Sequence, residues 1–485
     1  MIKKLRFACS LAFAFLVSQN LSAQGPVLPK ANKGQQGPTR PNIIMIVADD
    51  LGYGDLGSYG QKYIKTPYLD RLAAEGMRFT HAYAGAPIGG AARASLMTGL
   101  HTGHTYIRGN KNIPLRAKDI TIAEVLRQAR YKTIALGKWG LGLENTTGEP
   151  FKKGFEHWAG FTTQEHADNY YPQFLWRFEP GFKGVNAFHG MVPIYRNREG
   201  RRVEYSQDLI TKAALNSIRI YRPAFDNKYQ PFFLYISYTT PHANNDLFSK
   251  TGNGMEVPHN RPYSQYRWPL PERNKAAMIT RLDADVGKIV DKIAQYKMEK
   301  DTIIIFTSDN GPHAEGGVNP TYLGSAGPLR GIKRSLYEGG IRVPLIIRWT
   351  GKTKANTISE LPVGAWDFMP TLAQIARSRA PRDLDGVSFL ATLQGLPQTQ
   401  KHEFLYWEFH EGGSKQAARM GDWKVVRPAL GDRLELYNLK TDIGETKNVA
   451  AQHPDVIIKF ENFLRTARTR STHWPLTKAT PPGGR

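Results

Sequence analysis

Charged and amide side chains follow several apolar segments of this 485-residue chain, and their types could hold a cation beside an anionic substrate. In chain order, these side chains are Asp49, Asp50, Lys138, His242, Asp309 and Asn310. Carboxylates and an amide form the all-oxygen donor set that hard divalent cations require. Taken singly, each acidic pair also fits a turn or a helix cap, and the histidine also fits a structural role.

The elements that must position these groups are short, almost continuous apolar runs. They span residues 43–48, 133–136, 232–237, 302–307 and 343–348. Such runs are typical of strands buried on both faces of a largely parallel sheet. Helical patterns lie between them, for example after the capping box that starts at Thr121. Because binding groups gather at the carboxyl ends of strands in open α/β sheets, the sequence predicts a cation site flanked by lysine and histidine there. A site of this kind suits a phosphate or sulfate ester.

A glycine-rich segment, residues 86–99, precedes a predicted short helix that carries Arg93. The backbone N–H groups at the start of such a helix can bind an anion. A tight loop is the alternative interpretation of the pair Gly89-Gly90, which cannot decide between the two by itself.

The pattern changes after about residue 380, and we predict two domains. Residues 41–380 form the larger, catalytic α/β domain, and residues 381–485 form a smaller α+β domain. Within the smaller domain, the spacing predicts strands at 404–409, 416–420, 423–426 and 434–437 and a helix over 454–468. Residues 24–40 are rich in Pro, Gly, Gln and Lys and are predicted to be a flexible lead-in.

Residues 1–23 have the basic, apolar and small-residue regions of a secretory signal peptide. We therefore expect export to the periplasm or the medium, and no integral membrane association, because no later stretch is apolar enough. The only cysteine, Cys9, lies in this segment, which excludes disulfides and cysteine-based metal sites. Cleavage after Ala23 removes three positive charges from the net +23 and leaves +20. This charge fits polyanionic partners if it gathers on one face, and a generally basic surface is the alternative. Nucleic acid is a poor partner for an exported chain.

Taken together, these segments resemble the sulfatase family, arylsulfatase-like members of the alkaline-phosphatase-like superfamily. The matching motifs are Asn42 to Asp55, Arg93 to Gly99, Gly137-Lys138-Trp139, Pro241-His242, Ser308 to Gly311 and Arg330 to Gly340. The resemblance implies an alkaline-phosphatase-like large domain, with a central, mostly parallel sheet between helices, and a smaller C-terminal α+β domain. It also implies hydrolysis of sulfate esters, and we expect sulfated polysaccharides or oligosaccharides as the partners.

The resemblance also assigns roles to individual residues. It implies a calcium ion, with magnesium as an alternative, held by Asp49, Asp50, Asp309 and Asn310. It implies that Arg93 steadies the nucleophile. The groups that it implies hold the sulfate ester and help the leaving oxygen to depart are Lys138, His242 and Lys333.

Two positions depart from the family pattern. The family oxidises a Cys or Ser four residues before the arginine to formylglycine, but Gly89 stands there and has no side chain to oxidise. Formylglycine therefore cannot form at this position, and the usual covalent mechanism is unavailable. The second departure is Gly140, where many relatives carry His. His166 could supply an imidazole instead, although an ordinary surface role fits it equally well.

Two hypotheses follow from these observations. In the first, the chain is a sulfuric ester hydrolase with residual turnover by a metal-bound water placed where the side chain is missing, because positioned charges still act on the transition state. In the second, it is a catalytically inactive pseudo-sulfatase that binds sulfated ligands. Gly89 favours the second hypothesis, and the otherwise complete family pattern favours the first.

Overall fold

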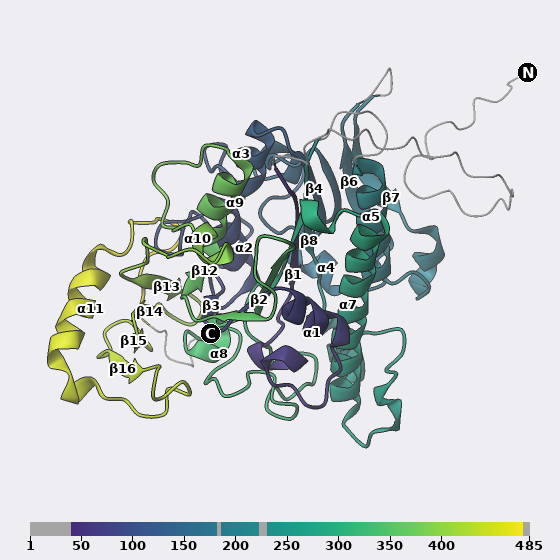
Figure 1. The fold of residues 1–485 in the computed structure, drawn as a ribbon. Helices are drawn as coiled ribbons and strands as arrows, with labels where there is room; N and C mark the ends of the chain where they lie inside the picture. The colour runs from purple at the N-terminus through teal and green to yellow at the C-terminus, as the bar shows by residue number, and fades with distance from the viewer. Residues whose placement is uncertain (1–39, 182–185, 223–229, 479–485) are drawn as a thin grey trace, which may run out of the picture. The chain divides into compact units, whose positions relative to one another are not determined.

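The computed structural model describes residues 40–181, 186–222 and 230–478 (Figure 1). The predicted signal peptide, and all of the predicted lead-in except Arg40, lie outside these residues. None of the helices in the described part of the chain has both the length and the apolar character that a membrane crossing needs.

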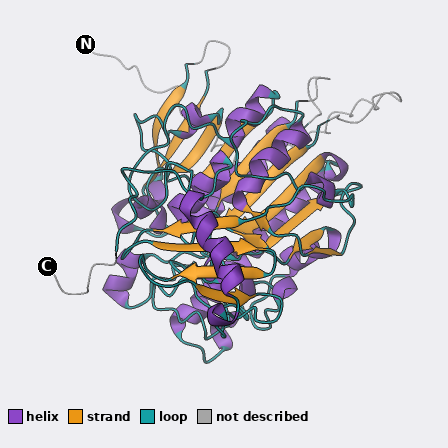
Figure 2. Cartoon of the chain, turned by 90° about the vertical axis from the view of Figure 1, so that its left-hand side faces the viewer, coloured by secondary structure: helices purple, strands orange, loops and turns teal. Residues whose placement is uncertain are grey.

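The large domain is built on a mixed sheet of ten strands (Figure 2). In spatial order these are β11 (Thr357–Ser359), β2 (Met77–Phe79), β10 (Leu345–Trp349), β9 (Thr302–Ser308), β1 (Asn42–Ala48), β8 (Phe232–Ser237), β4 (Lys132–Lys138), β5 (His157–Phe161), β6 (Phe174–Glu179) and β7 (Phe188–Pro193). The five strands from β9 to β5 run parallel, and Ile44 in β1 pairs with Leu234 in β8 and with Ile304 in β9.

Helices cover both faces of this sheet, as the apolar runs predict. Every residue of β1, β8 and β9 is buried, so their side chains contribute to a core on each face. The helices packed on one face are α2 (Gly89–Thr98), α3 (Ile122–Gln128) and α9 (Phe368–Ala376). The helices on the other face are α1 (Pro67–Glu75), α5 (Ser206–Tyr221) and α7 (Leu270–Gln295). The predicted alternation of strand and helix is thus confirmed.

The edges of the sheet differ from the expectation of parallel strands. The run 343–348 does form a strand, β10, but it lies antiparallel to β9. On the opposite edge, β6 and β7 form an antiparallel hairpin that the sequence did not predict. Their residues are half-buried or exposed, so the apolar run that marks a doubly buried strand is missing there.

The smaller C-terminal domain contains an antiparallel sheet and one long helix. The strands are β13 (Leu405–Phe409), β14 (Lys415–Met420), β15 (Trp423–Arg427) and β16 (Glu435–Asn438), followed by α11 (Pro454–Thr466). Val456, Phe460 and Leu464 of α11 pack on this sheet, as their spacing predicts. The remaining strands and helices, apart from 3-10 turns, are β3 (Ala82–Tyr83), α4 (Gln164–Asp168), α6 (Asn245–Thr251), α8 (Glu338–Ile341), β12 (Val363–Gly364) and α10 (Leu390–Leu393).

Candidate active site

The carboxyl ends of β1 and β9 bring the predicted oxygen donors together. Ala48 and Ser308 are paired across the two strands, so the residues that follow them leave the sheet side by side. The backbone N–H of Asp50 donates to Asp309 Oδ1 over 3.1 Å, and Asn310 Nδ2 donates to Asp50 Oδ1 over 2.7 Å. Asp50 has a φ of 66°, which few residues other than glycine adopt and which is often found at functional sites.

Each buried carboxylate of the cluster has a cation of its own. Lys138 Nζ lies 2.5 Å from Asp49 Oδ2, and Lys333 Nζ lies 2.8 Å from Asp50 Oδ2. Arg93 Nη1 lies 2.9 Å from Asp309 Oδ2, and both of these side chains are almost fully buried. Burying three carboxylates without such partners would cost several kcal/mol each. The three cationic side chains therefore meet at one cluster, although they belong to separate elements: β4, α2 and the segment after β9.

The electrostatics of the cluster are unevenly balanced. Burial, and then the negative charge of Asp49, raise the pKa of Asp309 to about 8, although the positive charge of Arg93 lowers it. Burial would also raise the pKa of Asp50, but the positive charge of Lys333 holds it below its usual range. Asp309 is thus the carboxylate that most needs a further positive charge.

Two buried polar atoms beside these carboxylates have no partner in the described residues. Asn310 Oδ1 accepts no hydrogen bond, and Arg93 Nη2 donates none. An unsatisfied buried oxygen next to three carboxylates matches the all-oxygen donor set of a hard divalent cation. Asp49, Asp50 and His242 also place ligand atoms within 4.8 Å of one another. The residues present therefore fit a divalent cation.

His242 and Lys333 form the second half of the site. Lys333 Nζ lies 3.1 Å from His242 Nε2, and His242 Nδ1 lies 2.8 Å from the carbonyl oxygen of Ala243. Because an ammonium group can only donate, Nε2 accepts and the ring proton lies on Nδ1. Burial, and then the charge of Lys333, lower the pKa of His242 to about 3, so the ring is neutral.

The structure adds site residues that sequence reasoning missed. Asp168, at the end of α4, lies with Oδ1 3.2 Å from His242 Nδ1, and burial raises its pKa to about 7. Glu315 lies 3.3 Å from Lys333 Nζ and also pairs with Arg334. Asp168 is the last residue of α4, whose N-cap is Thr163. The charged residues of this short segment were the signal in the sequence that could have pointed to Asp168.

His166 belongs to the same segment but is held elsewhere. Its Nε2 lies 3.1 Å from the carbonyl oxygen of Phe174, and its ring contacts Phe161 and Phe174. The structure thus does not bring this predicted substrate-binding residue together with Lys138 or His242. Asp168, two residues along the same helical turn, is the side chain that reaches the site instead.

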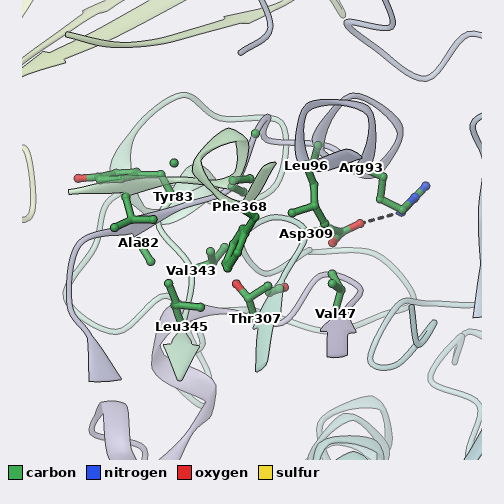
Figure 3. Close-up of a pocket in the computed structure, with 17 residues that line it drawn as sticks. Val47, Ala82, Tyr83, Arg93, Leu96, Thr307, Asp309, Val343, Leu345 and Phe368 are labelled. Carbon is green, nitrogen blue, oxygen red and sulfur yellow. Dashed lines mark hydrogen bonds and ion pairs between the residues drawn. The ribbon is translucent and has the colours of Figure 1, made fainter. Parts of the chain in front are cut away.

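Gly89 is the first residue of α2 and points at the pair formed by Arg93 and Asp309. A Cβ built on Gly89 would lie 2.8 Å from both Arg93 Nη1 and Asp309 Oδ2. Figure 3 shows this ion pair beside a small, mainly apolar cavity to which Leu96 and Phe368 contribute. The polar groups therefore meet on the Gly89 side, and the cavity behind them is part of the core.

The whole of the large domain matches one family of proteins. A family profile described as Sulfatase matches residues 41–378. The chain belongs to the sulfatase family. A second profile, described as N-sulphoglucosamine sulphohydrolase, C-terminal, matches residues 332–469.

Characterised sulfatases and solved structures show the same likeness. The chain is 29% identical to an N-acetylgalactosamine-6-O-sulfatase of Bacteroides thetaiotaomicron, over 90% of this chain and 94% of the relative. It is 31% identical to arylsulfatase A of Bos taurus, over 79% and 74% of the two chains. The crystal structure of Ps i-CgsB in complex with k-i-k-neocarrahexaose superposes with a TM-score of 0.73 at 27% identity, covering 90% and 95% of the two chains.

Against the sulfatase pattern, Gly140 is a second place where a side chain is missing. Its φ is 66°, and a Cβ added there would lie 3.0 Å from Gln164 Nε2 and 3.1 Å from Arg93 Nη2. The amide of Gln164 and the unpartnered nitrogen of Arg93 thus both border the point where a Cβ would lie, at the position where many sulfatases carry a histidine. Gln164 is a further site residue that the sequence did not single out.

Proposed function

We propose that this chain is a sulfuric ester hydrolase of the arylsulfatase type that acts on sulfated glycans. The observation that carries the proposal is the convergence of Arg93, Lys138 and Lys333 with neutral His242 on one cluster of buried oxygens. Such a group of fixed donors can hold a sulfate group and the charge that develops on it in the transition state.

A calcium ion is the cation that we propose for this site, with magnesium as the alternative. Asp49, Asp50, Asp309 and Asn310 would hold it, because three carboxylates and an amide supply only oxygen ligands. When bound, the ion would supply positive charge that polarises the ester.

The lysines and His242 act on the two ends of the ester. Lys138 can donate to a sulfate oxygen while it remains paired with Asp49. Lys333 can donate to the leaving oxygen when it exchanges its hydrogen bond to His242 Nε2 for one to the ester. The carbonyl oxygen of Ala243 keeps the Nδ1 proton of His242 in place, so Nε2 stays directed at Lys333.

The attacking group cannot come from residue 89, because glycine has no side chain to convert to formylglycine. We propose that water takes its place beside Arg93. The ion pair of Arg93 and Asp309 must move apart to admit it, because a Cβ on residue 89 would lie only 2.8 Å from both side chains. The water oxygen bonds to sulfur, the bond from sulfur to the leaving oxygen breaks, and the alcohol and hydrogen sulfate are the products. Losing the nucleophile lowers the rate, but the remaining donors still act on the transition state.

A second candidate function is that of a catalytically inactive pseudo-sulfatase. Gly89 is the observation that favours it, because the same lysines, His242 and cation ligands would hold a sulfated ligand without cleaving it. Binding and hydrolysis use the same groups, so only the missing side chain separates the two functions.

Sulfated glycans are proposed as ligands on two grounds. One relative is named an N-acetylgalactosamine-6-O-sulfatase, and one similar structure contains k-i-k-neocarrahexaose. The net charge of +23 also suits a polyanionic substrate. Export to the periplasm or the medium, which the N-terminal sequence predicts, would place the chain where such glycans occur.

Hydrolysis of a chromogenic aryl sulfate tests the proposal. The wild-type chain, Gly89→Cys and Gly89→Ala are produced with a formylglycine-generating enzyme and assayed with Ca²⁺. Turnover by the wild type that Gly89→Ala abolishes, while Ca²⁺ still raises the melting temperature of the variant, supports attack by water beside Arg93. Turnover only in Gly89→Cys identifies a pseudo-sulfatase with an otherwise intact site. If no variant turns over or binds a sulfated oligosaccharide, the assignment to sulfate esters is wrong.

A further inference from the structure

A basic groove in the C-terminal domain contains none of the residues of the candidate active site. It lies between the end of α11, the segment after it and the loop that follows β15, and has a volume of about 360 Å³. Four arginines and one carboxylate are the charged groups that line it: Arg427, Arg465, Arg468, Arg470 and Glu461. These residues carry a net charge of +3, and the volume is in the range of ligand-binding pockets.

Two of the arginines are held in place by protein groups. Arg427 lies with Nη2 2.7 Å from Glu461 Oε2 and with Nη1 2.7 Å from the side-chain oxygen of Gln416. Arg468 donates from Nε to buried Glu408 over 2.7 Å. The one carboxylate that lines the groove is therefore already neutralised by Arg427, and repels an incoming anion less.

The other two arginines are exposed and available. The guanidinium groups of Arg465 and Arg470 make no hydrogen bond or ion pair with any residue in 40–181, 186–222 or 230–478, and both side chains are exposed. A guanidinium group presents two parallel N–H donors that match two oxygens of a sulfate or phosphate group. Holding two like charges at one groove disfavours the free protein slightly, and an anion between them would relieve that repulsion.

The walls of the groove also suit a sugar ring. Leu430, Leu464 and Leu476 line it together with the arginines. Pyranose rings have apolar faces of C–H groups and polar edges, so apolar walls with guanidinium groups at the rim fit a ring that carries sulfate. A carbohydrate with charged substituents fits this surface better than an inorganic anion alone.

We propose that this groove binds the sulfate groups of a polysaccharide at a distance from the ester that the active site holds. The choice of a sulfated glycan as the ligand rests on the proposed function. Two sites on one chain would raise the effective concentration of further esters at the active site, as in any bivalent interaction. The groove would thus favour polymers over short oligosaccharides.

The test compares two double variants that each remove two exposed positive charges. Arg465→Ser/Arg470→Ser alters the groove, and Lys212→Ser/Arg219→Ser alters exposed positions on α5 as a charge-matched control. Binding of chondroitin 6-sulfate and of unsulfated hyaluronan is measured by calorimetry at one fixed ionic strength, because salt screens such contacts. We expect the groove variant to bind chondroitin 6-sulfate roughly tenfold more weakly and the control to match the wild type. Hyaluronan should bind weakly to all three proteins.

Equal binding of chondroitin 6-sulfate by both variants would overturn the proposal. A single-stranded oligonucleotide gives a second test. If it binds the wild type as tightly as chondroitin 6-sulfate does, and loses as much affinity in the groove variant, the groove recognises negative charge alone and the proposal is overturned. Binding of a small aryl sulfate, measured in the same variants, reports on the active site separately. If it is absent throughout while the polymer still distinguishes the two variants, the proposed function fails and the groove stands.

Discussion

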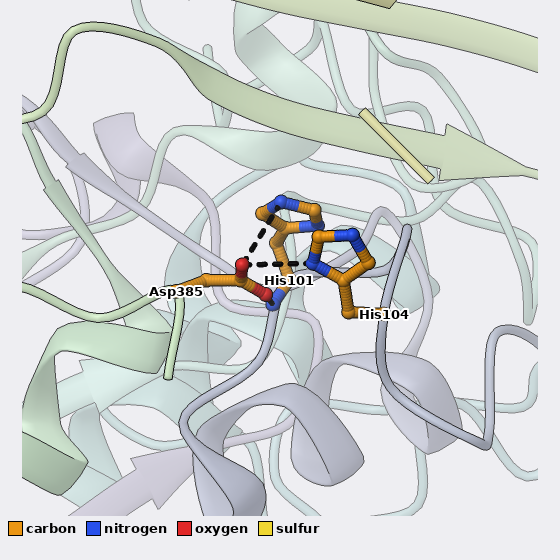
Figure 4. A group of neighbouring side chains, drawn as sticks. All are labelled: His101, His104 and Asp385. Carbon is orange, nitrogen blue, oxygen red and sulfur yellow. Dashed lines mark hydrogen bonds and ion pairs between the residues drawn. The ribbon is translucent and has the colours of Figure 1, made fainter. Parts of the chain in front are cut away.

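Within the part of the chain that the structure describes, two groups of side chains place three possible metal ligands within 4.8 Å of one another. The two groups differ in how many of their lone pairs already accept hydrogen bonds. One is the cluster of Asp49, Asp50 and His242 at the strand ends. The other is formed by His101, His104 and Asp385, shown in Figure 4. Two histidines and an aspartate would suit zinc better than the first cluster does, so residue types alone favour the second as a metal site.

The hydrogen bonds of the second cluster contradict that interpretation. The backbone N–H of Gly103 donates to His101 Nδ1 over 3.1 Å, so the proton of the neutral ring lies on Nε2 and faces Asp385. His104 Nδ1 lies 2.8 Å from Asp385 Oδ1, and the backbone N–H of His101 donates to Asp385 Oδ2. Neither ring nitrogen of His101 can bind a metal in this arrangement. The group is a hydrogen-bonded clamp that ties the segment after α2 to Asp385.

The cluster at the strand ends has the opposite character. Asn310 Oδ1 and Arg93 Nη2 are buried without partners, and burial raises the pKa of Asp309 to about 8. An unsatisfied acceptor and an unsatisfied donor beside a carboxyl group with a raised pKa indicate a place for a cation and for an anion that it attracts. The comparison shows that the number of possible ligands does not identify a metal site. What distinguishes the binding site from the clamp is that its polar atoms still lack hydrogen-bond partners.

The largest expected effect comes from breaking the clamp. Asp385→Ala removes the acceptor of three contacts and leaves the His101 backbone N–H unpaired, which should lower the free energy of unfolding by about 3 kcal/mol. Thermal unfolding with and without Ca²⁺ checks this. We expect Ca²⁺ to raise the melting temperature of Asp385→Ala by as much as it raises that of the wild type. If the variant no longer responds to Ca²⁺, the two clusters are coupled.

Asp309→Ala should instead abolish the response to calcium. An ion at 100 times its dissociation constant stabilises the folded state by about 2.7 kcal/mol, so the wild type should melt a few degrees higher with Ca²⁺ than with a chelator. The variant should melt at one temperature in both conditions. A variant that still gains stability from Ca²⁺ would place the ion elsewhere.

The pH dependence of stability sharpens the comparison further. Burial lowers the pKa of His101 to about 4, whereas the unfolded chain has the usual value near 6.5. Between these values the unfolded state binds more protons, so stability from this group is present above pH 6.5 and lost as the pH falls towards 4. The slope should be at most about 1.4 kcal/mol per pH unit.

His101→Asn tests this slope, because an amide oxygen can still accept from Gly103. Chemical denaturation between pH 4 and 7 should show a shallower dependence in the variant than in the wild type. Equal slopes would show that His101 is not buried in its neutral form.

The smallest expected effect is that of zinc on the clamp. Because the Nε2 proton of His101 faces Asp385, addition of Zn²⁺ should stabilise His104→Ala and the wild type to the same degree. A rise in melting temperature that depends on His104 would show that the ring can change tautomer and bind metal.

The sequence predicts the centre of the fold better than its edges. The strands β1, β8 and β9 are apolar throughout, so burial on both faces is visible in the residues themselves. β6 and β7 lack such a pattern, and the direction of β10 depends on pairing with β2 and β9, which no local pattern encodes. Long-range pairing decides these strands, not local preference.

The candidate site shows the same limit. The residues at strand ends, such as Asp49 and Lys138, can be found because the sheet brings such ends together. Asp168 and Gln164 reach the site from α4, a five-residue helix between β5 and β6, whose position depends on contacts far along the chain. The sequence singled out His166 in that segment, but the turn of α4 directs its ring to Phe174.

The central claim is that the cluster at the strand ends, and not the clamp, binds the cation. Titration of Ca²⁺ into the metal-stripped chain by calorimetry tests it most directly, with Asn310→Ala and His104→Ala as the paired variants. We predict one calcium ion bound by the wild type and by His104→Ala, with much weaker binding by Asn310→Ala. Calcium binding that His104→Ala abolishes and Asn310→Ala leaves unchanged would contradict the account.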